Sequence, residues 1–341
     1  MLHQQRRPRV GLQVPLPLQP RRQLRLHLID GYAKQLAYAT LVALLGQVVL
    51  ARLTRSGTAP RLGILAWYVA ALTAVCSWAV GAMAVADPDP LHGLAHLITA
   101  GMTAVHEGTG VHHVTAPGAR WLRIPAVVAA VAIVYRAGYC VARDAGGAHR
   151  RRLRHAGALA LVARPLGGRD ALVLRESTPL AYCVPGRSRM IVVTDGAVRA
   201  LSEPELDAVL AHERAHLSGR HHLLHTPLRS LARAFPGIPV LARASREVGR
   251  LLEMCADDAA VRRHGRAAVA GALRSLSGSP TPPETFAAGS TSAEERITRL
   301  CRPDHRRSRT SGGLVTAVAV LTTGPVASVA IPILLAASSK G

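Results

Sequence analysis

The stretch that most constrains the fold is LDAVLAHERAHLSG, residues 206–219. Its H-E-x-x-H motif places His212 and His216 four residues apart. On a helix both imidazoles then lie on one face and can bind the same metal ion. Glu213 points about a quarter-turn round the helix, where its carboxylate can act as a general base toward a water molecule. A zinc site needs a third protein ligand, which another element must supply.

Local signals around the motif favour a helix that begins near residue 202 and ends near residue 219. Ser202 is a good N-terminal cap, and Glu205 completes a capping box three residues later. Pro204 is tolerated in the first turn of a helix. Gly219 is a suitable C-terminal cap. The metal-binding motif therefore lies on a well-defined predicted helix.

The segments before and after this helix predict an α+β domain. Short apolar runs before it predict strands, and the last two predict a hairpin with a Pro-Gly turn; the four runs are ALALVA, ALVLRES, LAYCVPG and SRMIVVTDG. After the motif, helices are predicted over residues 223–234, 240–264 and 292–301, with a break at FPGIP.

The predicted helix over 240–264 supplies the missing ligand. Glu253 and Asp257 are four residues apart and share a face of this helix. Glu253 is the candidate third ligand, and Asp257 can accept the second ring N–H of a ligand histidine and so fix its tautomer. Asp258 is the alternative for that role. The competing interpretation is a surface glutamate on an alanine-rich helix and incidental histidines.

Long apolar segments predict a membrane protein. Hydrophobic residues make up 49% of the chain and aromatic residues only 3%. Four segments have the length and apolar character expected of transmembrane helices; they are 32–53, 62–86, 124–142 and 314–337. Arginine asymmetry between the loops places the block 143–313 in the cytoplasm and the loop 87–123 outside. The histidines of that loop are candidates for a second metal or pH-sensing site, with a solvated loop as the alternative; they are His92, His96, His106, His112 and His113.

The net charge of +22 does not by itself indicate a nucleic-acid partner. All but two of the 42 basic residues are arginine, the exceptions being Lys34 and Lys340. Together with the alanine excess, this is typical of coding bias in a GC-rich genome. No helix-turn-helix, zinc-finger or RNA-binding signature accompanies the charge, so no nucleic-acid partner is expected.

Three stretches in order carry a resemblance to a known family: AYCVPGRSRMIVVTDGAVRALSEPELDAVLAHERAHLSGRHH, EMCADDAAVRRHG and EERITRL. They resemble the membrane-embedded gluzincin metallopeptidases of the BlaR/MecR type (antirepressor-like), which are related to the HtpX-type proteases. The resemblance covers roughly residues 30–340 and is strongest over 180–265. It implies zinc binding by His212, His216 and Glu253, with Glu213 as the catalytic general base and Asp257 as the carboxylate behind a ligand histidine.

The chain departs from the two groups at several points. No penicillin-binding sensor domain follows the last predicted span, so β-lactam sensing is not expected. His221 stands where these families often have aspartate. The S-T-H-P motif of HtpX-type proteases is replaced by STSA at 290–293, so the residue that stabilises the oxyanion is unassigned. The candidates are His221, His222, His225 and His264.

These features together predict a mostly α integral membrane protein with about four transmembrane helices and an inserted α+β zincin-like metallopeptidase domain. The expected domains are a disordered basic N-terminus or mis-assigned start (1–30), three transmembrane helices with loops (31–142), the zinc metallopeptidase domain (143–313), and a fourth transmembrane helix with a tail (314–341).

The predicted function is that of a zinc endopeptidase with one Zn2+ per chain, embedded as a multi-pass protein in the lipid bilayer of a bacterial plasma membrane. Its catalytic domain would face the cytoplasm and act in regulated proteolysis on a protein or peptide substrate, such as a cytoplasmic repressor. The strand at 190–193 is expected to pair with the extended substrate. The alternatives are an HtpX-type quality-control protease and a non-catalytic transducer that retains the zinc fold.

Overall fold

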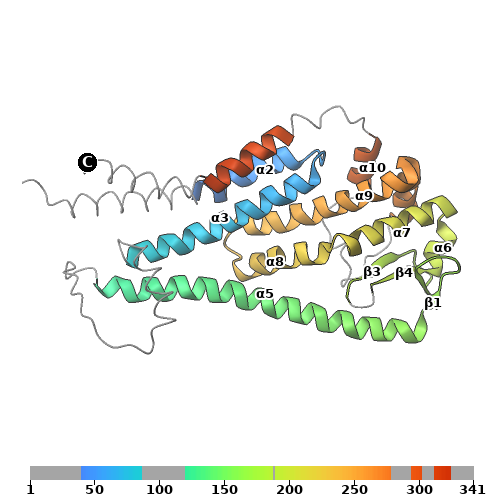
Figure 1. Ribbon diagram of the computed structural model, residues 1–341, viewed down its shortest axis with the longest axis horizontal. Helices are drawn as coiled ribbons and strands as arrows, with labels where there is room; N and C mark the ends of the chain where they lie inside the picture. Colours follow the sequence, from blue (N-terminus) through green and yellow to red (C-terminus); the bar gives the residue numbers. More distant parts are fainter. Residues whose placement is uncertain (1–39, 87–119, 187–188, 278–292, 302–310, 324–341) are drawn as a thin grey trace, which may run out of the picture.

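The computed structural model describes residues 40–86, 120–186, 189–277, 293–301 and 311–323 (Figure 1). The predicted disordered tail, the histidine-rich loop and residues 290–292 lie outside this part. The described elements are the π-helix η1 (Val42–Gly46), α2 (Gln47–Thr54), α3 (Pro60–Ala86), α5 (Arg120–Val162), β1 (Arg164–Pro165), β2 (Leu172–Leu174), β3 (Ala181–Val184), β4 (Met190–Thr194), α6 (Asp195–Ala200), α7 (Glu203–Ser218), α8 (His221–Ala234), α9 (Pro239–Leu276) and α10 (Ala293–Cys301). Residues 311–323 are also helical.

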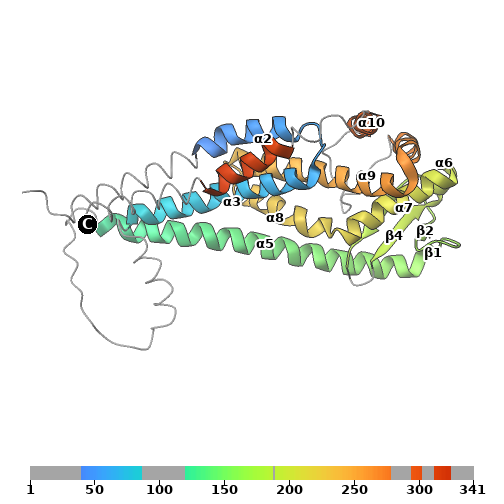
Figure 2. The ribbon, with the colours of Figure 1, turned by 45° about the horizontal axis from the view of Figure 1, so that its top comes forward.

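Long helices run side by side along the molecule, and the small sheet lies at one end (Figures 1 and 2). The core of the helical part brings together α2, α3, α8, α9 and the helix over 311–323. Trp67 of α3 is fully buried there, and its indole N–H donates to the Thr54 hydroxyl at 3.3 Å. The apolar segments near both ends of the sequence therefore pack against α9, which contains the candidate ligand Glu253.

The predicted transmembrane architecture is not supported. Among the described residues, no helix combines the length and the apolar character required to cross a bilayer. This finding corrects the predicted fold class: the described chain is mostly helical with a small sheet. Large apolar side chains are nevertheless exposed along several helices, including Leu72 of α3 and Val134 of α5.

The segment around residues 143–163 differs from the sequence prediction. The run ALALVA was predicted as a strand, and a domain boundary was predicted after residue 142, but α5 continues without interruption from Arg120 to Val162. Alanine and leucine have high helix propensity, and no proline interrupts the helix after Pro125. Tertiary packing adds to this preference, because Leu159 is buried against the sheet.

The sheet has four strands in the order β1-β2-β4-β3. β3 and β4 form the predicted antiparallel hairpin, and β2 pairs with β4 in parallel. Alternate side chains of β4 face opposite sides: Val192 packs toward α5, whereas Ile191 and Val193 pack toward α7. The sheet therefore lies between α5 and the helix that carries the metal-binding motif.

Each end of α7 is set by the residues that the sequence predicted. Ser202 and Glu205 form the capping box, with the Ser202 backbone N–H donating to the Glu205 carboxylate at 2.9 Å. Gly219 caps the C-terminus, and α8 begins directly after Arg220. The predicted helix over 240–264 corresponds to the first part of α9, which kinks at Gly265, where φ is +81°. A glycine adopts that conformation without the steric cost that a Cβ would add.

Candidate metal centre

Small side chains allow the two ligand-bearing helices to approach closely. Ala208 and Ala211 of α7 are buried in one cluster with Ala260 of α9, and Ala256 of α9 is also fully buried. Alanine removes bulk from the helix contact without reducing helix propensity. The close packing brings the metal-binding face of α7 next to the face of α9 that carries Glu253.

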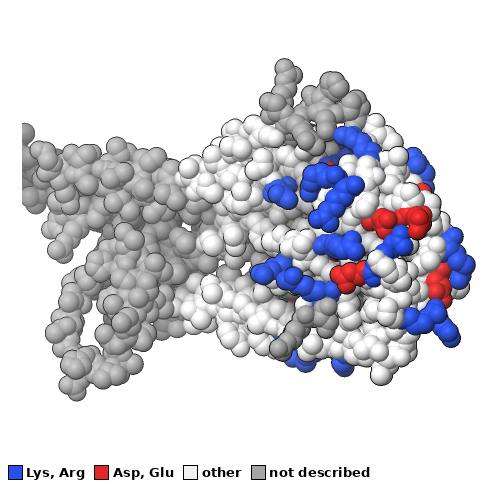
Figure 3. Space-filling view, turned by 45° about the vertical axis from the view of Figure 1, so that its right-hand side comes forward, with Lys and Arg blue, Asp and Glu red and all other residues white. Residues whose placement is uncertain are grey.

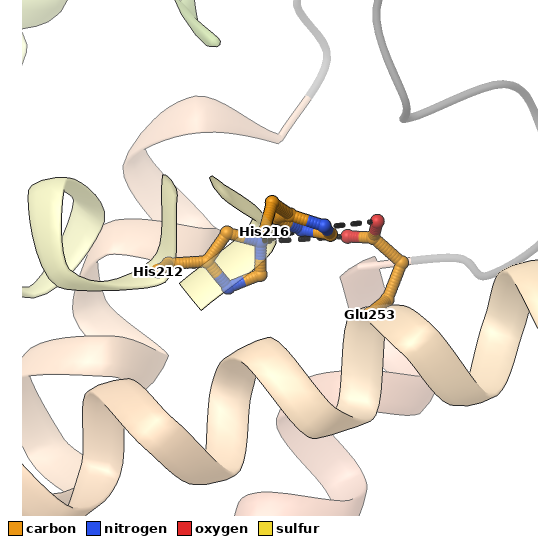
Figure 4. A group of neighbouring side chains, drawn as sticks. All are labelled: His212, His216 and Glu253. Carbon is orange, nitrogen blue, oxygen red and sulfur yellow. Dashed lines mark hydrogen bonds and ion pairs between the residues drawn. The ribbon is translucent and has the colours of Figure 1, made fainter. Parts of the chain in front are cut away.

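Three side chains converge between α7 and α9 (Figure 4). His212 Nε2 and His216 Nε2 are 3.0 Å apart. The Glu253 carboxylate lies 3.5 Å from His212 Nε2 through Oε2 and 3.4 Å from His216 Nε2 through Oε1. All three residues offer ligand atoms within 4.8 Å of one another. The structure therefore brings together the three ligands that the sequence predicted.

The donor set and its spacing fit zinc. Zinc binds imidazole nitrogen and carboxylate oxygen in a tetrahedral arrangement, and at bonds of about 2.05 Å two ligand atoms lie about 3.3 Å apart. The separations of 3.0, 3.4 and 3.5 Å bracket this value. Two neutral imidazoles and one carboxylate leave a fourth position for a reacting molecule, as in catalytic zinc sites.

Asp257 contacts His212 on the side of the ring that faces away from the metal position. Its Oδ1 lies 3.1 Å from His212 Nδ1, and its side chain is only 1% exposed. The contact fixes Nδ1 as the protonated nitrogen and leaves Nε2 to face the metal position. The neighbouring Asp258 points elsewhere and pairs with Arg299 at 2.8 Å. Of the two adjacent carboxylates, Asp257 is the one in contact with a ligand histidine.

Glu213 and Glu253 have opposite electrostatic environments. Burial raises the pKa of Glu213 to about 7, and the Cys183 thiol of β3 lies beside its carboxylate. Burial also acts on Glu253, but His216, His212 and Arg296 outweigh it and hold the pKa of Glu253 well below its usual range. Glu253 is therefore an anion suited to bind a cation, whereas Glu213 can exchange a proton near neutral pH.

In a comparison with known protein families, the model described as peptidase family M48 matches residues 148–329, which is more than half of the chain. The chain belongs to peptidase family M48. No curated protein and no solved structure matched. M48 peptidases are zinc-dependent metallopeptidases, and the matched region contains the convergent residues His212, His216 and Glu253.

In this M48 chain His216, the other predicted histidine ligand, contacts a further histidine, His221. His221 Nδ1 lies 2.9 Å from His216 Nδ1. With His216 Nε2 facing the metal position, Nδ1 carries the proton and donates it to His221 Nδ1. His221 was one of four candidates for the oxyanion role, but its Nδ1 is occupied by this contact. Burial lowers the pKa of His221 to about 4, which keeps it a neutral acceptor at pH 7.

The sequence did not identify Arg296 of α10 as part of the metal centre. Its guanidinium binds both oxygens of Asp257, with Nε to Oδ2 at 2.8 Å, and Nη1 lies 3.2 Å from Glu253 Oε2. These carboxylates raise its pKa further above the usual range despite its burial. The stretch EERITRL contributed to the family resemblance, but its spacing alone does not show that one of its arginines reaches α9.

The expected substrate-pairing strand is also corrected. β4 lies between β2 and β3, and at Val192 and Val193 both of its hydrogen-bonding edges are occupied. Among the described residues, β3 pairs only with β4 and forms an edge of the sheet. Thr194 N–H donates to the Leu180 carbonyl, and by alternation the backbone groups of Ala181 and Cys183 face away from β4. Cys183 also contacts Glu213, so this edge borders the metal centre of the M48 domain.

Proposed function

We propose that this M48 metallopeptidase is a zinc-dependent endopeptidase of the H-E-x-x-H gluzincin type that acts on protein substrates. The convergence of His212, His216 and Glu253 carries the proposal. The resemblance to BlaR/MecR-type peptidases supports regulated proteolysis as its role. The alternative of a non-catalytic transducer is disfavoured, because such a protein has no use for a buried general base beside the metal ligands.

Zinc bound to His212, His216 and Glu253 would supply a Lewis acid that polarises the scissile carbonyl and makes water a better nucleophile at neutral pH. The chain supplies the proton transfers. Glu213 accepts a proton from the attacking water and delivers it to the leaving amine. Glu213 must gain and then lose the same proton, and its burial, which raises the pKa of the metal-free carboxyl group to about 7, favours the protonated form that the second step needs.

The edge of β3 is the proposed binding strand for the substrate backbone. The outward N–H and C=O groups of Ala181 and Cys183 can pair with an extended peptide. Backbone pairing is independent of side-chain identity, so it orients a peptide without selecting its sequence. Because Cys183 contacts Glu213, a peptide on this edge lies alongside the general base.

The Glu213→Gln variant tests the function. Glutamine keeps the shape but cannot accept the proton, so peptide hydrolysis should fall by at least about 100-fold. Zinc content, measured by elemental analysis, should stay at one ion per chain because the ligands are unchanged. Cleavage of an unfolded protein substrate gives the activity. Glu203→Gln, an exposed position on the same helix, is the matched control. Full activity in Glu213→Gln would overturn the proposal.

A second variant separates metal binding from proton transfer. His216→Ala removes one ligand, and both zinc content and hydrolysis should be lost. A wild-type protein that binds zinc but cleaves no unfolded protein or peptide mixture would instead support the non-catalytic alternative.

A further inference from the structure

A large cavity beside α7 is lined by arginines. Its volume is about 760 Å³, within the range of pockets that hold ligands. Five arginines from four separate places in the chain line it, and Asp170 is the one acidic residue among the described lining residues; the arginines are Arg61, Arg189, Arg214, Arg262 and Arg263. On the face shown in Figure 3, at the end of the molecule that holds the sheet, basic side chains also outnumber acidic ones. The cavity therefore has a strong positive field.

None of these five guanidinium groups is paired with a carboxylate within the part of the chain that the structure describes. No hydrogen bond or ion pair joins any of them to another described residue. Elsewhere, Arg169, Arg250 and Arg299 each bind a carboxylate. What distinguishes the five is that they converge on one cavity from α3, α7, α9 and the β3–β4 connection. Like charges brought together repel, and an anionic ligand relieves that repulsion.

Part of the cavity wall is a stripe along α7 that faces away from the general base. Ala211, Ala215 and Ser218 line the cavity and form this stripe. Glu213 is two residues from Ala211 and is therefore rotated by about 200° from it. Leu217, four residues from Glu213, and Ile191, the cross-strand partner of Cys183, also line the cavity, so it reaches the side of α7 next to the proposed substrate edge at β3. It also borders the metal centre, because His221 lines its wall and contacts His216.

The remaining wall indicates the class of ligand. Apolar side chains line the cavity between the arginines, namely Ile64, Ile191, Leu217, Leu224 and Leu252. Among the described residues that line the cavity none is aromatic, so this part of the wall offers no stacking surface of the kind on which single-stranded nucleic acids rely. A peptide that carries both carboxylates and aliphatic side chains complements both parts of the wall.

We propose that this cavity is a docking site for an acidic peptide segment with aliphatic side chains, contributed by a protein partner. Carboxylates of the segment pair with the arginines at the rim, and its aliphatic side chains pack on the apolar wall. None of its residues is a predicted metal ligand or general base, so docking can be measured in a protein that lacks peptidase activity.

Binding of a fluorescent peptide to the full-length protein tests the proposal. The probe is an eight-residue peptide of alternating glutamate and leucine, and fluorescence anisotropy gives its dissociation constant. The experiment uses the Glu213→Gln background, so that cleavage does not affect the signal. Replacing both Arg262 and Arg263 by glutamate should weaken binding by about tenfold or more, because two ion pairs become two repulsions. Binding should also weaken at high salt.

The matched control is the double variant Arg199→Glu and Arg246→Glu, two exposed positions outside the cavity with the same change in net charge. It should bind the probe within about twofold of the parent protein. An equal loss in both double variants would show attraction to net charge only and overturn the proposal. So would unchanged binding in the Arg262/Arg263 variant.

A cationic peptide and two other anionic ligands test which property of the probe the cavity recognises. A lysine-leucine peptide should not bind. Single-stranded DNA and vesicles that contain phosphatidylserine should bind more weakly than the acidic peptide, and without dependence on Arg262 and Arg263. Tighter binding of either, lost in the Arg262/Arg263 variant, would assign the cavity to that ligand and overturn the peptide proposal.

Discussion

Two glutamates within one site differ in role because their neighbours differ. Glu253 faces two imidazoles and the Arg296 guanidinium, which stabilise its charged form. Glu213 instead contacts the neutral Cys183 thiol, and burial penalises its charge. The same residue type thereby becomes a permanent anion in one place and a proton acceptor in the other.

Metal binding should change the titration of Glu213. Without metal its carboxyl group should titrate near pH 7, because burial raises its pKa to about 7. A bound cation favours the charged carboxylate, so zinc should lower this pKa. Infrared spectra of the carboxyl bands over pH 4–9, with and without zinc, measure both values. In Glu213→Gln the titrating band should be missing; a band that persists there would belong to another residue.

The base must be deprotonated to act, which sets the direction of the pH dependence. The rate of hydrolysis should fall as the pH decreases through the zinc-bound pKa of Glu213, which the cation lowers from its metal-free value. A profile of kcat/KM against pH checks this expectation. An acid limb above pH 7 would contradict it.

His221 should position His216 for metal binding. Replacing His221 by alanine leaves the His216 Nδ1–H without its acceptor at 2.9 Å and should weaken zinc affinity about 10- to 100-fold. His221→Asp restores an acceptor and should recover most of the affinity. Competition with a zinc chelator measures both. His264→Ala is the control, because His264 is exposed. Equal zinc affinity in His221→Ala and the wild type would exclude the positioning role.

Sequence spacing was sufficient for residues on a single helical face and insufficient for tertiary contacts. His212 and His216, and likewise Glu253 and Asp257, follow from the four-residue repeat of a helix. Arg296 lies 39 residues beyond Asp257, and only the packing of α10 on α9 brings the two together. The contact of Cys183 with Glu213 depends in the same way on how the sheet packs on α7.

At the scale of elements, α10 is attached to α9 by ion pairs in both directions. Arg296 binds Asp257 and Arg299 binds Asp258 from α10, while Arg250 of α9 binds Glu295 at 2.9 Å. Arg250 also donates to the carbonyl oxygen of Thr54 at 2.7 Å, which connects this contact to the end of α2. The position of α10 therefore sets the environment of the metal centre.

The two arginine contacts of α10 should differ in their effect on stability. Arg296→Gln leaves Asp257, only 1% exposed, as a buried charge without its guanidinium partner, and should cost about 3–5 kcal/mol of unfolding free energy. Arg299→Gln affects Asp258, which is 26% exposed, and should cost about 1 kcal/mol or less. Denaturant unfolding of the metal-free protein measures both. Equal losses would show that burial of the partner does not decide the cost.

Helical elements after the motif were predicted well, and the segment before the sheet was not. The capping residues Ser202 and Glu205 and the break at 235–238 act locally, so the sequence shows them. The run ALALVA has the length of a strand and no local signal that excludes one. Its helical state follows from the continuation of α5 and the burial of Leu159 against the sheet, which are tertiary effects.

At the scale of the whole molecule, α9 joins two cores. Its first part, including Leu241 and Leu252, packs with Trp67 of α3, and its last part packs with α7 through Val269 and Ala272. Glu253 lies between the two. The sequence indicated the apolar segments and the metal-binding motif separately, but hydrophobic patterns cannot show that both pack on the same helix.

Unfolding of the helical core should therefore release the metal. Leu241→Ala creates a cavity at a fully buried position in the core around Trp67 and should cost about 2–5 kcal/mol. Because α9 spans both cores, the tryptophan fluorescence transition and the release of zinc should shift together to lower denaturant concentration. Leu153→Ala, at a 52% exposed position of α5, should shift neither by more than about 0.5 kcal/mol. If Leu241→Ala moved the fluorescence transition and left zinc release unchanged, the two cores would unfold independently and α9 would not couple them.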